Sequence, residues 1–139
     1  ISYSKHHKHS YHLIRHANLF DFAPREIEII ANIARYHRKS LPKPHHDNFR
    51  RLSAQDQELV MKLGGILRLA DGLDRRRSQL VNELKCRLSK QCLTINLVGE
   101  GDLSVEIFGG QAKGDMIEKA FARKLVLRHK SSPAAPCSA

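Results

Sequence analysis

The longest regular pattern of apolar residues lies between residues 53 and 73. Apolar side chains recur there every three or four positions, which is the spacing of one face of an α-helix. Ser53 is a suitable N-cap, and Asp56 adds a carboxylate in the first turn, where the helix dipole favours it. We therefore predict a helix whose apolar stripe contains Leu59, Val60, Leu63, Ile66, Leu67, Ala70 and Leu73.

Two aspartates lie at the end of this helix. On a helical wheel Asp74 projects near the middle of the apolar stripe and Asp71 near its edge, whereas Arg68 and Arg75 lie on the outer side. A carboxylate on a buried stripe is costly unless it is hydrogen-bonded, ion-paired or bound to a metal. Both aspartates should therefore have partners.

Two further helices are expected earlier in the chain. Residues 5–20 have a helical pattern in which His9, His12 and His16 share one flank. These imidazoles could bind a metal or a phosphate, or they could simply form a solvated face.

The second of these helices should begin at Pro24 and run to about Lys39. Proline suits the first turn because its missing N–H has no partner there, and two further prolines forbid continuation of the helix beyond residue 41. His37 shares an arc with Ile30 and Ile33. It is therefore expected to be buried, as a core residue or as a ligand at the rim of a cleft.

Residues 38–51 have the composition of an exposed, basic, proline-broken loop, in which Asp47 is the only acidic residue. Phe49 is expected to anchor this loop to the core, because a single aromatic side chain is too little for a base-stacking surface. The cationic residues of the loop are Arg38, Lys39, Lys43, Arg50 and Arg51.

After residue 77 the apolar period changes from helical to two. Residues 81–87, 92–98 and 103–108 are predicted strands, and the last two are expected to form an antiparallel hairpin around the turn at residues 99–102.

The remainder predicts a short helix over residues 112–123 and a final strand near residues 125–127. The fold class is therefore α+β: a helical region over residues 1–78, then a β-β-β-α-β subdomain over residues 79–129 with a small antiparallel sheet and one helix. Residues 130–139 are predicted to be a disordered tail.

Charge indicates the class of ligand. The 24 Lys and Arg residues against 14 Asp and Glu give a formal net charge of +10, which favours polyanions such as nucleic acid, phosphates or acidic lipid. The alternative is a basic protein without such a ligand. Because 41% of the residues are hydrophobic, the chain is long and apolar enough to fold around a core.

The compartment is expected to be cytoplasmic. The three cysteines are odd in number and lack CxxC spacing, which favours reduced thiols, and no apolar run is long enough for a membrane helix. The chain opens on Ile1 rather than methionine, which suggests a fragment of a longer protein.

Three motifs, in this order and spacing, carry a family resemblance. They are His6-His7-Lys8-His9-Ser10-Tyr11, Ala34-Arg35-Tyr36-His37-Arg38-Lys39, and Leu67-Arg68-Leu69-Ala70-Asp71-Gly72-Leu73-Asp74-Arg75. Together they resemble the C-terminal HD-like domain of the exopolyphosphatase/guanosine pentaphosphate phosphohydrolase (Ppx/GppA) family. The resemblance extends over residues 1 to about 129.

The resemblance implies that the catalytic groups and Mg²⁺ lie in an N-terminal, actin-like pair of lobes of the parent chain, outside this segment. The present segment would be an HD-like bundle, truncated at its N-terminus, that helps to bind polyphosphate or pppGpp without being active alone. Distributed cations bind such polymers through many modest contacts and through counterion release. The expected substrate-binding residues are His9, His37, Arg38, Lys39 and Lys43.

The resemblance also implies a metal site, because HD domains bind divalent metal through a His, a His-Asp doublet and a distant aspartate, sometimes with added histidines. Asp71 matches the distant aspartate, and His9 and His37 lie where additional histidines can occur. The doublet is absent from these residues and should lie immediately before Ile1, so the metal site would be incomplete here. Asp74 is expected to be a structural ion-pair or capping partner of nearby arginines.

Two other functions stay open from the sequence. One is a metal-dependent HD phosphohydrolase acting on nucleotides, and the other is a basic module that binds RNA or other polyanions. No membrane partner is expected, and homodimerisation is left open.

Overall fold

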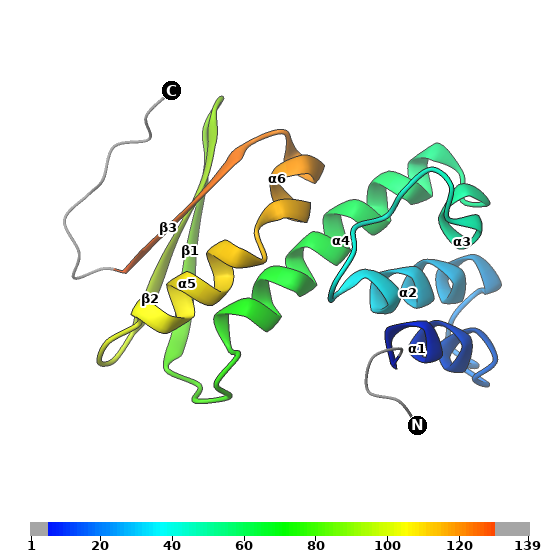
Figure 1. Cartoon of the computed structure of the whole chain (residues 1–139), viewed down its shortest axis with the longest axis horizontal. Coiled ribbons are helices and arrows are strands. Elements are labelled where there is room, and N and C mark those ends of the chain that lie inside the picture. Colours follow the sequence, from blue (N-terminus) through cyan, green and yellow to red (C-terminus); the bar gives the residue numbers. More distant parts are fainter. Residues whose placement is uncertain (1–5, 130–139) are drawn as a thin grey trace.

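The fold is α+β, with a three-stranded sheet at one end of the molecule and three helices at the other (Figure 1). The computed structural model describes residues 6–129. Its elements are α1 (His6–Arg15), α2 (Pro24–Tyr36), α3 (Asp47–Arg50), α4 (Ala54–Leu73), β1 (Val81–Leu88), β2 (Cys92–Gly99), α5 (Ser104–Ala112), α6 (Asp115–Phe121) and β3 (Lys124–His129).

The long helix α4 connects the two ends of the molecule (Figure 1). Its N-cap is the predicted one, because the backbone N–H of Asp56 donates to Ser53 Oγ over 3.1 Å. Helix α4 packs against α2, α5 and α6. The prediction of a helix from residue 53 to residue 73 is confirmed.

The face that α4 buries differs from the predicted stripe. Several of its large apolar side chains are more than a third exposed, namely Leu59, Leu63, Ile66 and Leu67. Glycines occupy much of the buried face instead, and they let the neighbouring helices approach closely. A Cβ built on Gly65 would lie 2.9 Å from backbone atoms of Ile117, and one built on Gly72 would lie 2.5 Å from the carbonyl oxygen of Gly109.

The basic loop is shorter than predicted because it contains α3. Phe49 in this short helix is only 8% exposed, so its predicted role as an anchor is confirmed. It packs edge-on against the ring of Tyr36, with 6.1 Å between centroids. The buried cluster around it contains Ile29, Tyr36, Phe49, Val60 and Met116.

The sheet has the order β1-β2-β3, with β1 and β2 antiparallel and β2 and β3 parallel. The strands predicted near residues 81–87, 92–98 and 125–127 are therefore confirmed. Parallel neighbours need a crossover connection, and α5 and α6 supply it. The sheet is mixed rather than antiparallel, and two helices accompany it rather than one.

The predicted strand over residues 103–108 is wrong, and with it the predicted hairpin around residues 99–102. The alternation of Leu103, Val105 and Ile107 indicated period two, but this segment belongs to α5. Asp102 favours the helical start, since its carboxylate accepts from the backbone N–H of Ser104 over 2.9 Å. The residues that α5 buries follow helical spacing, as Glu106, Gly109 and Gly110 do.

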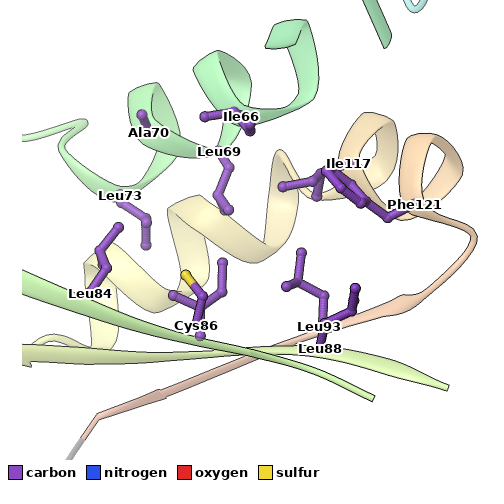
Figure 2. A pocket seen from close by; sticks show the side chains of 11 residues that line it. Ile66, Leu69, Ala70, Leu73, Leu84, Cys86, Leu88, Leu93, Ile117 and Phe121 are labelled. Carbon is purple, nitrogen blue, oxygen red and sulfur yellow. The ribbon is translucent and has the colours of Figure 1, made fainter. Parts of the chain in front are cut away.

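A second buried cluster joins α4 to the sheet and contains Leu69, Leu73, Ile95, Leu97, Leu103, Ile117 and Leu125. Next to it lies an open apolar cavity of about 300 Å³ between α4, α6 and the β1–β2 hairpin. Figure 2 shows Leu84, Cys86 and Leu88 of β1 forming one wall of this cavity, opposite side chains of α4 and α6.

Cys86 is an exposed free thiol, as expected. None of the helices in residues 6–129 combines the length and apolar character that a bilayer-spanning helix needs. The boundary near residue 78 stays a prediction, and the tail over residues 130–139 lies outside the described residues.

Candidate functional site

A cationic cavity of about 310 Å³ lies at the C-terminal end of α4, and we call it the Asp71 pocket. Three parts of the chain converge there: the residues after α2, the end of α4 with the loop that follows, and the junction between α5 and α6. The pocket is lined by Arg38, Asp71, Gly72, Asp74, Arg75, Arg77 and Lys113.

Asp71 is partly buried and forms an ion pair with Arg38, whose Nη2 lies 3.2 Å from Asp71 Oδ1. The Nε of Arg38 is buried and has no hydrogen-bond partner among residues 6–129. An unpaired buried donor of this kind costs free energy that an incoming acceptor can recover. The predicted partner for Asp71 is therefore present, and it is a cation of the pocket.

The pKa of Lys113 reflects the positive potential of the pocket. Burial lowers the pKa of its ammonium, and the nearby charges of Arg68, Arg75 and Arg38 lower it as well, against the opposing effect of Asp71. The cations around Lys113 thus outweigh the one carboxylate that favours its charged form. An anion placed in the pocket would relieve this repulsion.

The turn that follows α4 positions Arg77. This residue has φ 53°, in the left-handed region that costs a non-glycine residue roughly 1 kcal/mol. Asp74 stabilises the turn, since its carbonyl oxygen accepts from Arg77 N over 2.9 Å and its Oδ1 accepts from Gln79 N over 3.3 Å. Asp74 is exposed, so its predicted place on the buried stripe is wrong. It accepts from the backbone N–H of Arg77, as a capping partner would, and within residues 6–129 it forms no ion pair with an arginine side chain.

Arg68 is buried, although it was predicted on the outer side of α4. Only 3% of its side chain is exposed. Its Nη1 donates to the carbonyl oxygens of Tyr36, over 3.0 Å, and Lys39, over 3.2 Å, while Nε and Nη2 bind Asp115. Arg68 therefore joins α4 to the end of α2 and to the start of α6, the segments that hold Arg38 and Lys113.

The three consecutive arginines after α4 have different roles. Arg75 and Arg77 line the pocket, whereas Arg76 pairs with Glu106 of α5. Its Nε lies 2.8 Å from Glu106 Oε1 and its Nη2 lies 2.7 Å from Oε2, which is the bidentate geometry of strong guanidinium–carboxylate pairs. Glu106 is only 2% exposed, so this pair fixes the loop against α5.

Because of this ion pair, we expect the stability of the protein to fall at acid pH. Hydrogen bonding from Arg76 holds the pKa of Glu106 below its ordinary value of about 4.3, so the stabilisation is complete above that pH and is lost as pH falls through the lowered pKa. We expect Glu106→Gln to lower stability at pH 7 and to reduce its decline between about pH 5 and pH 3. Urea unfolding at several pH values measures both effects.

Glu58→Gln is the matched control, because the Glu58–Lys62 pair lies on the exposed side of α4. Its removal should change stability at pH 7 much less than Glu106→Gln does. Equal effects of the two variants would contradict a structural role for the buried pair.

The expected substrate-binding residues are only partly brought together. Arg38 lines the Asp71 pocket, but Lys39 and Lys43 are exposed on the loop after α2 and do not line it. His37 is half-buried, and its ring Nδ1 bonds to the carbonyl oxygen of Ala34. His9 is exposed on α1 and likewise does not line the pocket.

Sequence reasoning did not assign Arg75, Arg77 and Lys113 to a site. The run of arginines after residue 74 was a signal for the first two, because it directly follows the family motif. Lys113 gave no local signal, since only the packing of α5 against α4 brings it beside Asp71.

The donor set at Asp71 does not suit a metal ion. Its ion-pair partner is a guanidinium, and among the side chains that the structure describes, those of residues 9–129, no group of three or more His, Cys, Asp or Glu has metal-binding geometry. Metal binding at Asp71 stays a prediction that requires ligands from elsewhere. The residues described here are suited to anions instead.

The fold and the pocket define a basic α+β domain whose cavity is cationic. Residues 1–104 match the family model of domain III of the Ppx/GppA phosphatases. The match covers well over half of the chain, and the chain therefore belongs to the Ppx/GppA phosphatase family. A third domain implies a parent chain with several domains. No curated protein matches this chain.

Proposed function

We propose that this chain is the part of a Ppx/GppA phosphatase that binds polyphosphate, or the phosphate groups of pppGpp, in the Asp71 pocket. The observation that supports the proposal most directly is the gathering of four cationic side chains, from Arg38, Arg75, Arg77 and Lys113, around one ion-paired aspartate. Hydrolysis of the phosphoric anhydride, with its Mg²⁺, is assigned to the upstream domains of the parent chain.

The chemistry of the pocket suits a flexible polyanion. Guanidinium groups bind phosphate oxygens through two parallel N–H donors, and a lysine ammonium adds a compact point charge. Asp71 holds Arg38 in position before the ligand arrives, so less side-chain freedom is lost on binding. A polymer with about one charge per phosphate unit also gains from counterion release at each contact.

The test is polyphosphate binding by titration calorimetry with the single variants Arg75→Gln, Arg77→Gln and Lys113→Gln. Each should weaken binding by about tenfold, because a hydrogen bond to a charged group contributes about 1.5–3 kcal/mol. Each should also lower the slope of log affinity against log salt by about one. Arg87→Gln removes the same charge from exposed β1 and should have little effect.

Equal losses in Arg75→Gln and Arg87→Gln would show that only net charge matters and would reject the pocket as the site. Single-stranded RNA of equal charge tests the alternative of a general polyanion binder. Equal affinity for RNA, lost in the same variants, would favour that alternative.

The metal-dependent HD phosphohydrolase is tested in the parent protein. Bound metal that disappears in Asp71→Asn, together with loss of activity, would support it. An unchanged metal content and activity would exclude it.

A further inference from the structure

A second cationic cavity lies between α1, α2 and α3, and we call it the Arg51 pocket. Its volume is about 380 Å³, and none of its residues lines the Asp71 pocket. It is lined by Tyr11, His12, Arg15, Arg35, His45, His46, Asp47, Asn48 and Arg51.

The charges in this pocket are unbalanced. Arg15 pairs with Glu28, with 3.1 Å between Arg15 Nε and Glu28 Oε2, and the carboxylate of Asp47 pairs with Arg50, which does not line the cavity. Arg35 and Arg51 have no carboxylate partner anywhere in residues 6–129. Two guanidinium groups are therefore available to an anion.

Arg35 is held in a fixed position. Its guanidinium carbon lies 5.9 Å from the ring centroid of Tyr11 and 5.6 Å from that of Tyr36, within the range of cation–π contacts. Burial, with a hydrogen bond to Glu28, raises the pKa of Tyr11 to about 12, so its hydroxyl stays protonated and donates to that carboxylate. A stacked guanidinium keeps the N–H groups at its edge free to donate.

Buried polar groups support the pocket around α3. Asn48 is 8% exposed, and its side-chain nitrogen donates to Asn32 Oδ1 over 2.6 Å and to the hydroxyl of Tyr36 over 3.0 Å. The hydroxyl of Tyr36 also lies 2.9 Å from Nδ1 of His46. This network fixes α3 against α2 and thereby sets the position of Arg51, which directly follows α3.

We propose that the Arg51 pocket binds a single phosphoryl group through Arg35 and Arg51, at a site separate from the Asp71 pocket. The forked donors of guanidinium match phosphate oxygens, and Arg35, which is already held by its ring contacts, loses little freedom on binding. Free inorganic phosphate and the end of a longer phosphate chain present the same oxygens, so the pocket suits both sources. The proposal does not depend on the function proposed for the Asp71 pocket.

The test is an NMR titration of the ¹⁵N-labelled chain with inorganic phosphate at constant ionic strength. The largest shift changes are expected at the amides of Asn48 and Arg51. Arg51→Gln should weaken this binding by about tenfold, since it removes one charged hydrogen-bonding partner. Arg87→Gln removes the same charge from exposed β1, outside the cavity, and should change the affinity less than twofold.

Three results would overturn the proposal: equal weakening by Arg87→Gln and Arg51→Gln, shift changes that avoid α2 and α3, or no saturable change at all. Both arginines are exposed, so both variants are expected to fold, and thermal unfolding checks this.

Two further measurements distinguish free phosphate from a chain end, and the Arg51 pocket from the Asp71 pocket. If tripolyphosphate binds more tightly than phosphate, and Arg51→Gln removes this difference in affinity, the pocket binds the end of a phosphate chain. If the two affinities are equal, the pocket binds free phosphate. Arg75→Gln should leave the shifts at Asn48 unchanged. Experiments that reject anion binding in the Asp71 pocket are therefore distinct from those that reject phosphate binding in the Arg51 pocket.

Discussion

Replacing Gly72 with alanine is expected to lower the free energy of unfolding by about 3 kcal/mol, through overpacking between two helices. A Cβ at this position would lie 2.5 Å from the carbonyl oxygen of Gly109, 2.9 Å from its carbonyl carbon and 3.0 Å from Cα of Gly110. All three are backbone atoms, so the clash cannot be relieved by rotating a side chain. Helices α4 and α5 would have to move apart.

The same change should weaken polyphosphate binding, because Gly72 lines the Asp71 pocket and α5 leads directly to Lys113. Urea unfolding measures the stability, and calorimetry on the remaining folded protein measures the affinity. The loss of stability and the loss of affinity should appear together, because the same displacement of α5 away from α4 causes both.

Gly64→Ala is the matched control on the same helix. Its Cβ would meet Met116 Cε at 2.7 Å, which is the end of a flexible side chain that can turn away. Alanine also has a higher helix propensity than glycine by about 0.8–1 kcal/mol, so this variant should be close to neutral. A stable Gly72→Ala protein with unchanged affinity would show that the close α4–α5 contact is not required.

The second large effect is expected for Arg68→Met, which keeps the aliphatic stem and removes every donor. The carbonyl oxygens of Tyr36 and Lys39, which are buried or partly buried, would each lose a hydrogen-bond donor. Each unsatisfied group lowers the free energy of unfolding by about 1–3 kcal/mol. We expect a loss of about 3 kcal/mol in unfolding free energy.

Arg68 should also affect the site indirectly. Lys39 has φ 57°, and the hydrogen bond from Arg68 to its carbonyl oxygen holds this left-handed turn next to Arg38. Arg68→Met should therefore weaken anion binding, although its side chain does not line the Asp71 pocket.

Arg75→Met serves as the comparison for stability. Arg75 is exposed, so its replacement should change the unfolding free energy by less than about 0.5 kcal/mol while still weakening polyphosphate binding. Denaturant midpoints of the two variants distinguish the structural arginine from the binding one. Similar midpoints would contradict the structural role of Arg68.

Local sequence determined most of the helices and strands, and it also carried the family resemblance. The Ser53 cap, the proline at residue 24 and the alternation over residues 81–87 and 92–98 are all local signals, and the elements that they predict are present. These signals work because capping, backbone restriction and side-chain alternation depend on residues a few positions apart.

Tertiary packing decided what the local pattern left open. Residues 103–108 alternate like a strand, yet they form a helix because α5 buries its glycine face against α4. Arg68 appeared to be a surface residue on the helical wheel, and only the carbonyl oxygens of α2 and the carboxylate of Asp115 explain its burial.

The two cationic pockets depend on tertiary structure in the same way. Sequence identified Arg38 and Asp71 but could not place Lys113 beside them, and it could not show that Arg35 and Arg51 face one cavity. The sequence by itself determined the charge, the main elements and the family. The convergence of cations from distant segments was decided by the close helix contacts at glycines and by the buried arginine, because these interactions join residues that are far apart in the chain.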